Sequence, residues 1–200
     1  MYSDQSIKVL EFLSKKYNDA EIIVSFHRGL GKVDQYTTES DAKNTQKIAD
    51  VAKDIGTQVV DVSYSVDKIK FYDDCDLHIG YRVHAHIYFL SKRLPSILIH
   101  EDGRGNGVTE ALKSPGINAY RISKIYSSIF KVFNHNYYIS KIYSKLGMKV
   151  NEGIIDSLSK KIDEIENTKY ECFINTSKYI DEHFEIMERF IKRMIYRKEV

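Results

Sequence analysis

The sequence predicts an α/β fold: a mostly parallel, Rossmann-like sheet flanked by helices, followed by amphipathic C-terminal helices. Short apolar runs of strand length alternate with segments of helical apolar spacing up to residue 122, and residues 151–200 hold two stripes of helical period. Strands that alternate with helices are joined by crossovers and therefore lie parallel. We expect a Rossmann-like α/β domain over residues 1–122 and a helical extension packing on it over residues 123–200.

The individual elements follow from the apolar pattern and from the residues that end each segment. Gly56 is a suitable C-cap for the second helix, and Pro95 stands where the third helix must already have ended. The apolar run SILIH is typical of a buried strand. The expected helices are residues 5–17, 41–56, 83–93 and 108–112, and the expected strands are residues 20–26, 57–63, 76–80, 96–100 and, at the edge, 116–122.

Beyond residue 123 the character of the chain changes. Residues 124–149 contain five lysines, no acidic residue and many tyrosines and phenylalanines. Solvated lysines around the apolar stripe of a helix explain this pattern most simply, and a nucleic-acid platform and a glycan-facing surface are the alternatives. Residues 151–200 are rich in both charges, and their apolar stripes predict two amphipathic helices.

The composition is that of an ordinary globular protein. The 200 residues are 42% hydrophobic and 29% charged, and the net charge of +2 favours neither a nucleic-acid binder nor an acidic solvating chain. Cys75 and Cys172 match no metal-binding spacing, so reduced thiols in a cytoplasm are expected. No apolar stretch is long enough to span a bilayer, and the N-terminus lacks the features of a signal peptide. We expect a cytoplasmic protein with no membrane span and no nucleic-acid partner.

Ionisable residues follow several of the expected strands. Ligands of parallel α/β sheets bind beyond the carboxyl ends of the strands, which makes these positions the candidate site. His27 and Arg28 follow the first strand, and Arg82 follows the third. We expect them to converge on one crevice with residues 101–104, which follow the fourth strand. A solvated surface pair is an equally good interpretation of His27 and Arg28.

The stretch Glu101–Gly107, EDGRGNG, lies between a strand and a helix. Its three glycines allow backbone amides to approach an anion, and the helix N-terminus adds partial positive charge. Arg104 can add a bidentate contact, so Gly103, Arg104 and Gly105 are predicted to bind an anionic substrate. An ordinary glycine-rich turn is the alternative. The stretch has neither the Lys-Ser/Thr of a Walker loop nor GxGxxG spacing, so no dinucleotide or other cofactor is predicted.

Arg82, His84 and His86 lie where the third strand passes into a helix. An arginine in that position suits a carboxylate or a phosphate. Residues two apart point to opposite sides of a helix, so only one of the two imidazoles can face the crevice. His84, nearer the turn, is the candidate acid or base, and His86 is predicted to be structural, as is His78 inside its strand. His-x-His without a third ligand is a weak metal signal, so no metal site is predicted.

Together these motifs resemble the C-terminal, donor-side half of the polysaccharide pyruvyl transferase family. Ile79-Gly80 ends an apolar strand, Arg82-Val83-His84-Ala85 leads into a helix, and Pro95 precedes the next strand, in the order that members of the family show. The resemblance covers about residues 20–112. It implies half of a GT-B-like architecture and transfer of a pyruvyl group from phosphoenolpyruvate to a sugar of a polysaccharide, as a ketal. It also implies that Arg82 binds the donor anion and that His84 is a catalytic imidazole.

Two departures from the family pattern matter. Members usually carry an N-terminal domain before this one, so we expect this chain either to be a fragment of a larger enzyme or to have lost activity. The expected protein partners are such an N-terminal domain or a second copy of the chain. After the fourth strand, members often have a lysine or a less glycine-rich loop, where this chain has Glu101-Asp102-Gly103-Arg104-Gly105.

The chemistry of ketal formation also suits the residues themselves. Phosphoenolpyruvate carries a phosphate and a carboxylate, which Arg82 and the stretch Gly103–Gly107 can bind separately. His84 and Glu101 can share the proton transfers at the methylene carbon and the sugar hydroxyls, and this scheme requires no metal. Two other interpretations stay open: half of a GT-B glycosyltransferase that binds a nucleotide-sugar, and a non-catalytic domain that binds an anion or a protein partner.

Overall fold

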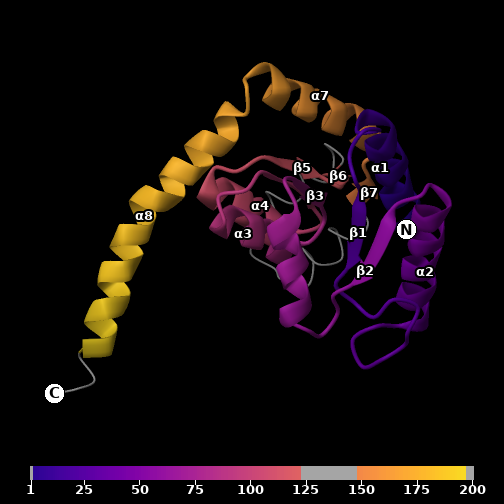
Figure 1. The fold of residues 1–200 in the computed structure, drawn as a ribbon, viewed down its shortest axis with the longest axis horizontal. Coiled ribbons are helices and arrows are strands. Elements are labelled where there is room, and N and C mark those ends of the chain that lie inside the picture. Colours follow the sequence, from indigo (N-terminus) through magenta and orange to yellow (C-terminus); the bar gives the residue numbers. More distant parts are fainter. Residues whose placement is uncertain (1, 123–147, 197–200) are drawn as a thin grey trace, which may run out of the picture. The chain divides into compact units, whose positions relative to one another are not determined.

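The computed structural model describes residues 2–122 and 148–196, and the chain folds into two compact units (Figure 1). Unit 1 comprises Met1–Cys75 and Ala119–Ser157, and unit 2 comprises Asp76–Asn118 and Leu158–Val200. Each unit is therefore assembled from two separate stretches of the chain. The lysine- and tyrosine-rich segment falls, apart from its last two residues, outside the described residues.

Unit 1 is built around a pair of parallel strands. Its elements are α1 (Tyr2–Lys16), β1 (Ile23–Phe26), α2 (Glu39–Asp54), β2 (Gln58–Asp61), the 3₁₀ helix η1 (Asp67–Asp74), β6 (Tyr120–Ile122) and β7 (Met148–Val150). β1 and β2 are parallel, with Val24 opposite Val59, whereas β6 and β7 are antiparallel. α2 begins at a capping box, because Thr38 and Asp41 satisfy each other's backbone amides. Its buried face consists of Ala42, Ala49 and Ala52.

The side chain of Gln5 joins the N-terminal helix α1 to the second stretch of unit 1 by hydrogen bonds. Gln5 is 4% exposed, and its Nε2 donates to the carbonyl oxygens of Ala119 at 3.0 Å and Asn151 at 3.3 Å. A buried amide is stable only when it is hydrogen-bonded in this way. Residues far apart in the sequence are thereby joined at one point.

Unit 2 is built around a three-stranded parallel sheet. Its elements are β3 (His78–Gly80), α3 (Val83–Ser91), β4 (Ser96–His100), α4 (Gly103–Leu112), β5 (Gly116–Asn118) and α8 (Glu171–Tyr196), and α7 (Ile154–Asn167) enters it from unit 1. The strand order is β3-β4-β5, so β4 is central, and all five of its residues are buried. This explains why SILIH is apolar rather than alternating.

The two C-terminal helices that the sequence predicts are present as α7 and α8. The apolar stripe of α7 is buried from Ile154 to Ile165. α8 is tied to the sheet side of unit 2 near its start, where Thr176 Oγ1 donates to the Lys113 carbonyl at 2.9 Å and Arg93 pairs with Asp181. None of the helices in residues 2–122 and 148–196 is long and apolar enough to cross a bilayer.

The structure confirms an α/β fold of small parallel sheets flanked by helices, which is compatible with a Rossmann-like fold, but it corrects the prediction of one sheet. The parallel strands among the described residues form a pair and a separate triplet. Between β2 and β3 the chain forms the short 3₁₀ helix η1 instead of a full crossover helix, which is the usual way to place the next parallel strand. The segment 116–122 is likewise two strands, β5 and β6, in separate sheets, with β5 at an edge as predicted.

A second correction concerns the glycine-rich stretch after β4. It is helical from Gly103, five residues earlier than the sequence predicts. Asp102 caps the helix and allows it to start at once, because its side chain accepts a hydrogen bond from the Arg104 amide.

Candidate functional site

The start of α3 is the first half of the candidate site. β3 ends at Gly80, and only Tyr81 and Arg82 separate it from the first residue of α3. Arg82 is the N-cap residue, and its side chain makes no capping hydrogen bond. The first amides of α3 therefore have no side-chain acceptor from their own cap, and the helix dipole adds positive potential there. The Arg82 guanidinium therefore lies close to the N-terminus of α3.

Glu101 supplies the negative charge beside this helix start. It follows β4 directly, and the parallel pairing of Gly80 with Leu98 sets the ends of β3 and β4 next to each other. Arg82 Nη1 and Glu101 Oε2 lie 3.9 Å apart, with side chains 39% and 30% exposed. That separation permits attraction but is too long for a hydrogen bond.

His84 and His86 lie in the first turn of α3 and differ in burial, as the sequence predicts. His84 is exposed, whereas His86 is fully buried. His84 is thus the imidazole of this pair that solvent or a ligand can reach. The structure brings Arg82, Glu101 and His84 to the same end of the sheet.

His86 belongs to a buried hydrogen-bond network. Its Nδ1 lies 2.6 Å from Ser96 Oγ, which is also 2.7 Å from His78 Nδ1, and its Nε2 lies 2.9 Å from Ser114 Oγ. Burial lowers the pKa of His86 from its ordinary value of 6.5 to about 4, and the nearby His100 adds to this shift. The role of His86 is to join α3 to β4, and His78 is a satisfied interior residue, as predicted.

The start of α4 differs from that of α3. The Asp102 carboxylate accepts from the Arg104 amide at 2.9 Å and from Arg104 Nε and Nη2 at 2.9 and 2.6 Å. The Arg104 guanidinium holds the pKa of Asp102 below its ordinary value. Here the helix N-terminus already has an anion, and the arginine already has a partner. Asp before a helix is a common N-cap signal that the sequence analysis did not use.

The glycines of this stretch are residues of the first turns of α4. A Cβ at Gly103 or Gly107 would meet nothing within 4 Å, so neither is required by close packing. Gly105 is buried, and a Cβ there would lie 3.3 Å from His100 Cα. Its glycine allows α4 to approach β4 closely. The predicted anion-binding residues Gly103, Arg104 and Gly105 thus lie close to Glu101 in the chain. The Arg104 guanidinium, however, is hydrogen-bonded to Asp102.

His100 fills the space between α4 and β5. Its Nε2 lies 3.0 Å from Thr109 Oγ1, and its Nδ1 lies 3.3 Å from Asn118 Oδ1. Burial lowers the pKa of His100. A Cβ at Gly116 would lie 2.0 Å from His100 Nε2, so this glycine is needed to make room for the imidazole.

His27 and Arg28 belong to unit 1 and follow β1. His27 Nε2 is 2.9 Å from the Tyr72 hydroxyl, which is also 2.7 Å from Ser25 Oγ. Arg28 is exposed and lies 3.5 Å from Asp41 at the start of α2. Both residues therefore have partners within unit 1. Tyr72, in η1, is the residue that the sequence analysis missed here, because η1 itself was not predicted.

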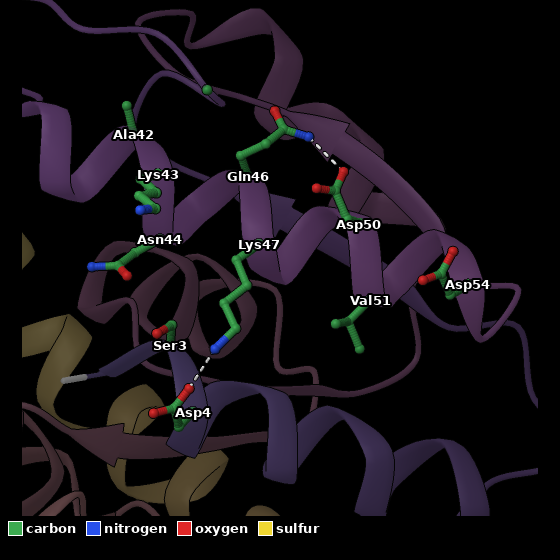
Figure 2. Close-up of a pocket in the computed structure, with 11 residues that line it drawn as sticks. Ser3, Asp4, Ala42, Lys43, Asn44, Gln46, Lys47, Asp50, Val51 and Asp54 are labelled. Carbon is green, nitrogen blue, oxygen red and sulfur yellow. Dashed lines mark hydrogen bonds and ion pairs between the residues drawn. The ribbon is translucent and has the colours of Figure 1, made fainter.

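Unit 1 also has a hollow between the start of α1 and the face of α2 (Figure 2). It is an open groove of about 860 Å³, and Lys47 reaches across it to Asp4 at 2.7 Å. Gln46 pairs with Asp50 along its rim at 2.6 Å.

Comparison with known proteins adds no further constraint: no protein-family model, no curated protein and no solved structure matches the chain. Within residues 2–122 and 148–196 no group of three or more His, Cys, Asp or Glu side chains could hold a metal ion. The residues at the ends of β3 and β4 are therefore the candidate functional site.

Proposed function

We propose that the chain is the donor-side, GT-B-like half of an enzyme that transfers a pyruvyl group from phosphoenolpyruvate to a sugar of a polysaccharide. The observation that carries the proposal is the loose pair of Arg82 and Glu101 at the uncapped start of α3. The resemblance of residues 79–100 to the pyruvyl transferase family supports the same reaction.

The donor binds at the start of α3 rather than at the start of α4. Arg82 binds the carboxylate or phosphate in a bidentate manner, and the first amides of α3 bind the other oxygens. Arg104 is a poorer ligand because Asp102 already neutralises it. The Glu101 carboxylate, which lies beside the donor in the complex, acts as the base.

The proton balance of the reaction needs two groups that can accept and donate protons. The methylene carbon of phosphoenolpyruvate gains one proton, both sugar hydroxyls lose one, and the departing phosphate takes up the other. The two new C–O bonds to the sugar replace the C–O bond to phosphate and the enol double bond. Glu101 accepts the proton of one sugar hydroxyl and passes it to the departing phosphate. His84 delivers a proton to the methylene carbon and takes one back from the second hydroxyl, while Arg82 stabilises negative charge on the donor.

Calorimetric titration of the full chain with phosphoenolpyruvate tests the proposal. Arg82→Ala is expected to lower the affinity by at least about tenfold, because a hydrogen-bonded charge pair contributes about 1.5–3 kcal/mol. Arg104→Ala is the matched control, since it removes the same side chain from the start of the neighbouring helix, and it is expected to change the affinity less than about twofold. Equal affinity in the wild type and Arg82→Ala, with unchanged thermal unfolding, would rule the proposal out.

A glycosyltransferase half with a nucleotide-sugar donor is the second candidate. The uncapped start of α3 favours it as well, because helix N-termini bind diphosphates. Thermal protection by uridine or cytidine diphosphate, without protection by phosphoenolpyruvate, would decide for this candidate.

A further inference from the structure

The surroundings of α8 change along its length. Near its start the helix packs within unit 2, where Phe173 and Thr176 are buried. From Asp181 onward every side chain that the structure describes in α8 is exposed. Phe184 and Ile186 are among them, at 52% and 57% exposure. The described parts of the chain therefore cover only the first part of this long, continuous helix (Figure 1).

The apolar pattern of α8 continues past the point where this cover ends. In the sequence, apolar residues recur alternately four and three positions apart at Ile180, Phe184, Met187, Ile191 and Met194. We call these five residues the seam, because this is the spacing of the narrow stripe that packs against a second helix in a coiled coil. Most of the stability of a protein helix comes from packing of its apolar face, so this part of α8 requires a partner.

The charges of the same part of the helix are divided by sign. The acidic half, residues 181–188, contains four acidic residues and no Lys or Arg, whereas the basic half, residues 189–198, contains five Lys or Arg and no acidic residue. When two such helices run antiparallel, the acidic half of each lies against the basic half of the other. A parallel arrangement would set like charges together. This surface is therefore complementary to itself, as a two-fold interface between identical chains requires.

Two of these charges are already paired within the chain, and the division by sign remains without them. Asp181 pairs with Arg93, and Glu188 lies 2.9 Å from Lys192, one turn further along the helix. Exposed ion pairs of this kind contribute only about 0–1 kcal/mol. Leaving out the residues of both pairs, the acidic half still has two negative charges and the basic half four positive charges.

We infer that residues 180–196 dock antiparallel on the same segment of a second copy of the chain. The two seams pack against each other, and each acidic half lies against a basic half. An anionic membrane or a nucleic acid would suit the basic half alone, because the acidic half is repelled by phosphate groups. The inference goes beyond the proposed function and does not rest on it.

Sedimentation equilibrium of the full chain, over roughly a hundredfold range of concentration, tests the inference. We expect a reversible dimer with twice the 23.3 kDa mass of one chain. Phe184→Ala is expected to weaken the dimer at least about tenfold, because it removes an aromatic side chain from the seam. Ile186→Ala is the matched control, since Ile186 has nearly the same exposure but lies on another side of the helix. It is expected to change the dissociation constant less than about twofold.

Charge reversal in the acidic half tests the orientation. Glu182 and Glu185 are both exposed, so Glu182→Lys combined with Glu185→Lys is expected to leave the fold intact. In an antiparallel dimer these lysines face the basic half of the partner, and the dissociation constant is expected to rise about three- to tenfold. In a parallel dimer the same change relieves repulsion and tightens association. Circular dichroism checks that the helix content of the variant is unchanged.

Several results would overturn the inference. One is a chain that stays monomeric at every concentration, and another is a dimer that Phe184→Ala leaves unchanged. Tighter association of the charge variant would exclude the antiparallel arrangement. A monomeric chain that sediments with vesicles of phosphatidylserine and phosphatidylcholine would assign the seam to a membrane surface instead. Phe184→Ala is expected to bind phosphoenolpyruvate as the wild type does, so a failure of donor binding leaves the dimer standing.

Discussion

The carboxyl ends of the two parallel sheets are constructed differently. In unit 2 the connections are short, since Tyr81 and Arg82 alone join β3 to α3, and Glu101 and Asp102 alone join β4 to α4. In unit 1 the connection from β1 to α2 takes residues 27–38 and folds around the Asp34 carboxylate. The short connections place charged side chains at helix starts, whereas the long loop presents aromatic side chains. The same end of a parallel sheet thus carries charged residues at helix starts in unit 2 and a long loop with exposed tyrosine in unit 1.

The starts of α3 and α4 differ in their cap residues. α3 and α4 both follow a parallel strand of the same sheet and both have an arginine in their first residues. Of the two helices, only α4 has an aspartate cap. The Asp102 carboxylate accepts a hydrogen bond from the Arg104 amide and forms an ion pair with the Arg104 guanidinium. The identity of the cap residue, rather than the number of glycines, separates the two helix starts.

The largest expected effect is a loss of stability of unit 2 at acid pH, which arises from His86. The pKa of His86 is about 4 in the folded chain and about 6.5 when unfolded, so below pH 6.5 the unfolded chain binds more protons. Stability is therefore complete above pH 6.5 and is lost as the pH falls towards 4, by about 3 kcal/mol in total. Urea unfolding followed by circular dichroism is expected to show a loss of about 2 kcal/mol between pH 7 and pH 5.

Two histidine variants identify the group responsible. His86→Gln removes the titrating imidazole and keeps polar atoms for Ser96 and Ser114, so its pH dependence is expected to be flatter. His84→Gln, on the exposed face of the same helix, is expected to keep the wild-type slope. A wild-type slope in His86→Gln would assign the acid sensitivity to other groups.

The next prediction distinguishes a glycine that close packing requires, Gly105, from a glycine that it does not require, Gly107. Gly105→Val is expected to destabilise the chain by about 1–3 kcal/mol, because its side chain would crowd the His100 backbone. Gly107→Ala, which meets nothing within 4 Å in the same helix, is expected to stabilise it by about 0.4–1 kcal/mol. Both are read from thermal unfolding. A loss of phosphoenolpyruvate affinity in Gly107→Ala would restore the prediction of an anion-binding loop at the start of α4.

The smallest effect concerns the long loop of unit 1. Tyr64→Phe removes the hydroxyl that bonds to Asp34 and lies next to the buried Thr37, and it is expected to cost about 0.5–1.5 kcal/mol. Tyr36→Phe is the matched control and is expected to have almost no effect, since only the backbone amide of Tyr36 bonds to Asp34. Equal unfolding free energies for the two variants would show that Asp34 does not hold the loops of Tyr36 and Tyr64 together.

Local pattern predicted most of the elements among the described residues, and it did so where one periodicity dominates. The strand SILIH and the helix that begins at Val83 were predicted correctly, as was the exposure of His84 against the burial of His86. These features depend on the spacing of side chains along one element. Spacing is visible in the sequence.

What depends on contacts between distant residues was not predicted. The division of the strands into separate sheets follows from η1, whose 3₁₀ turns leave no periodic apolar stripe to recognise. The bonds of Ser96 and Ser114 to His86 join residues 10 and 28 positions away. The start of α4 was misplaced for a different reason, since the glycines concealed an ordinary Asp cap.

The interleaving of the two units has a consequence for biosynthesis. The Gln5 side chain bonds to the carbonyl groups of Ala119 and Asn151, which are synthesised much later than Gln5. Strand β7, which pairs with β6, ends at Val150. A ribosome that adds roughly 5–20 residues per second must therefore deliver the first stretch of unit 2, Asp76–Asn118, before Gln5 can form both hydrogen bonds. Each unit is therefore complete only when its second stretch has been synthesised.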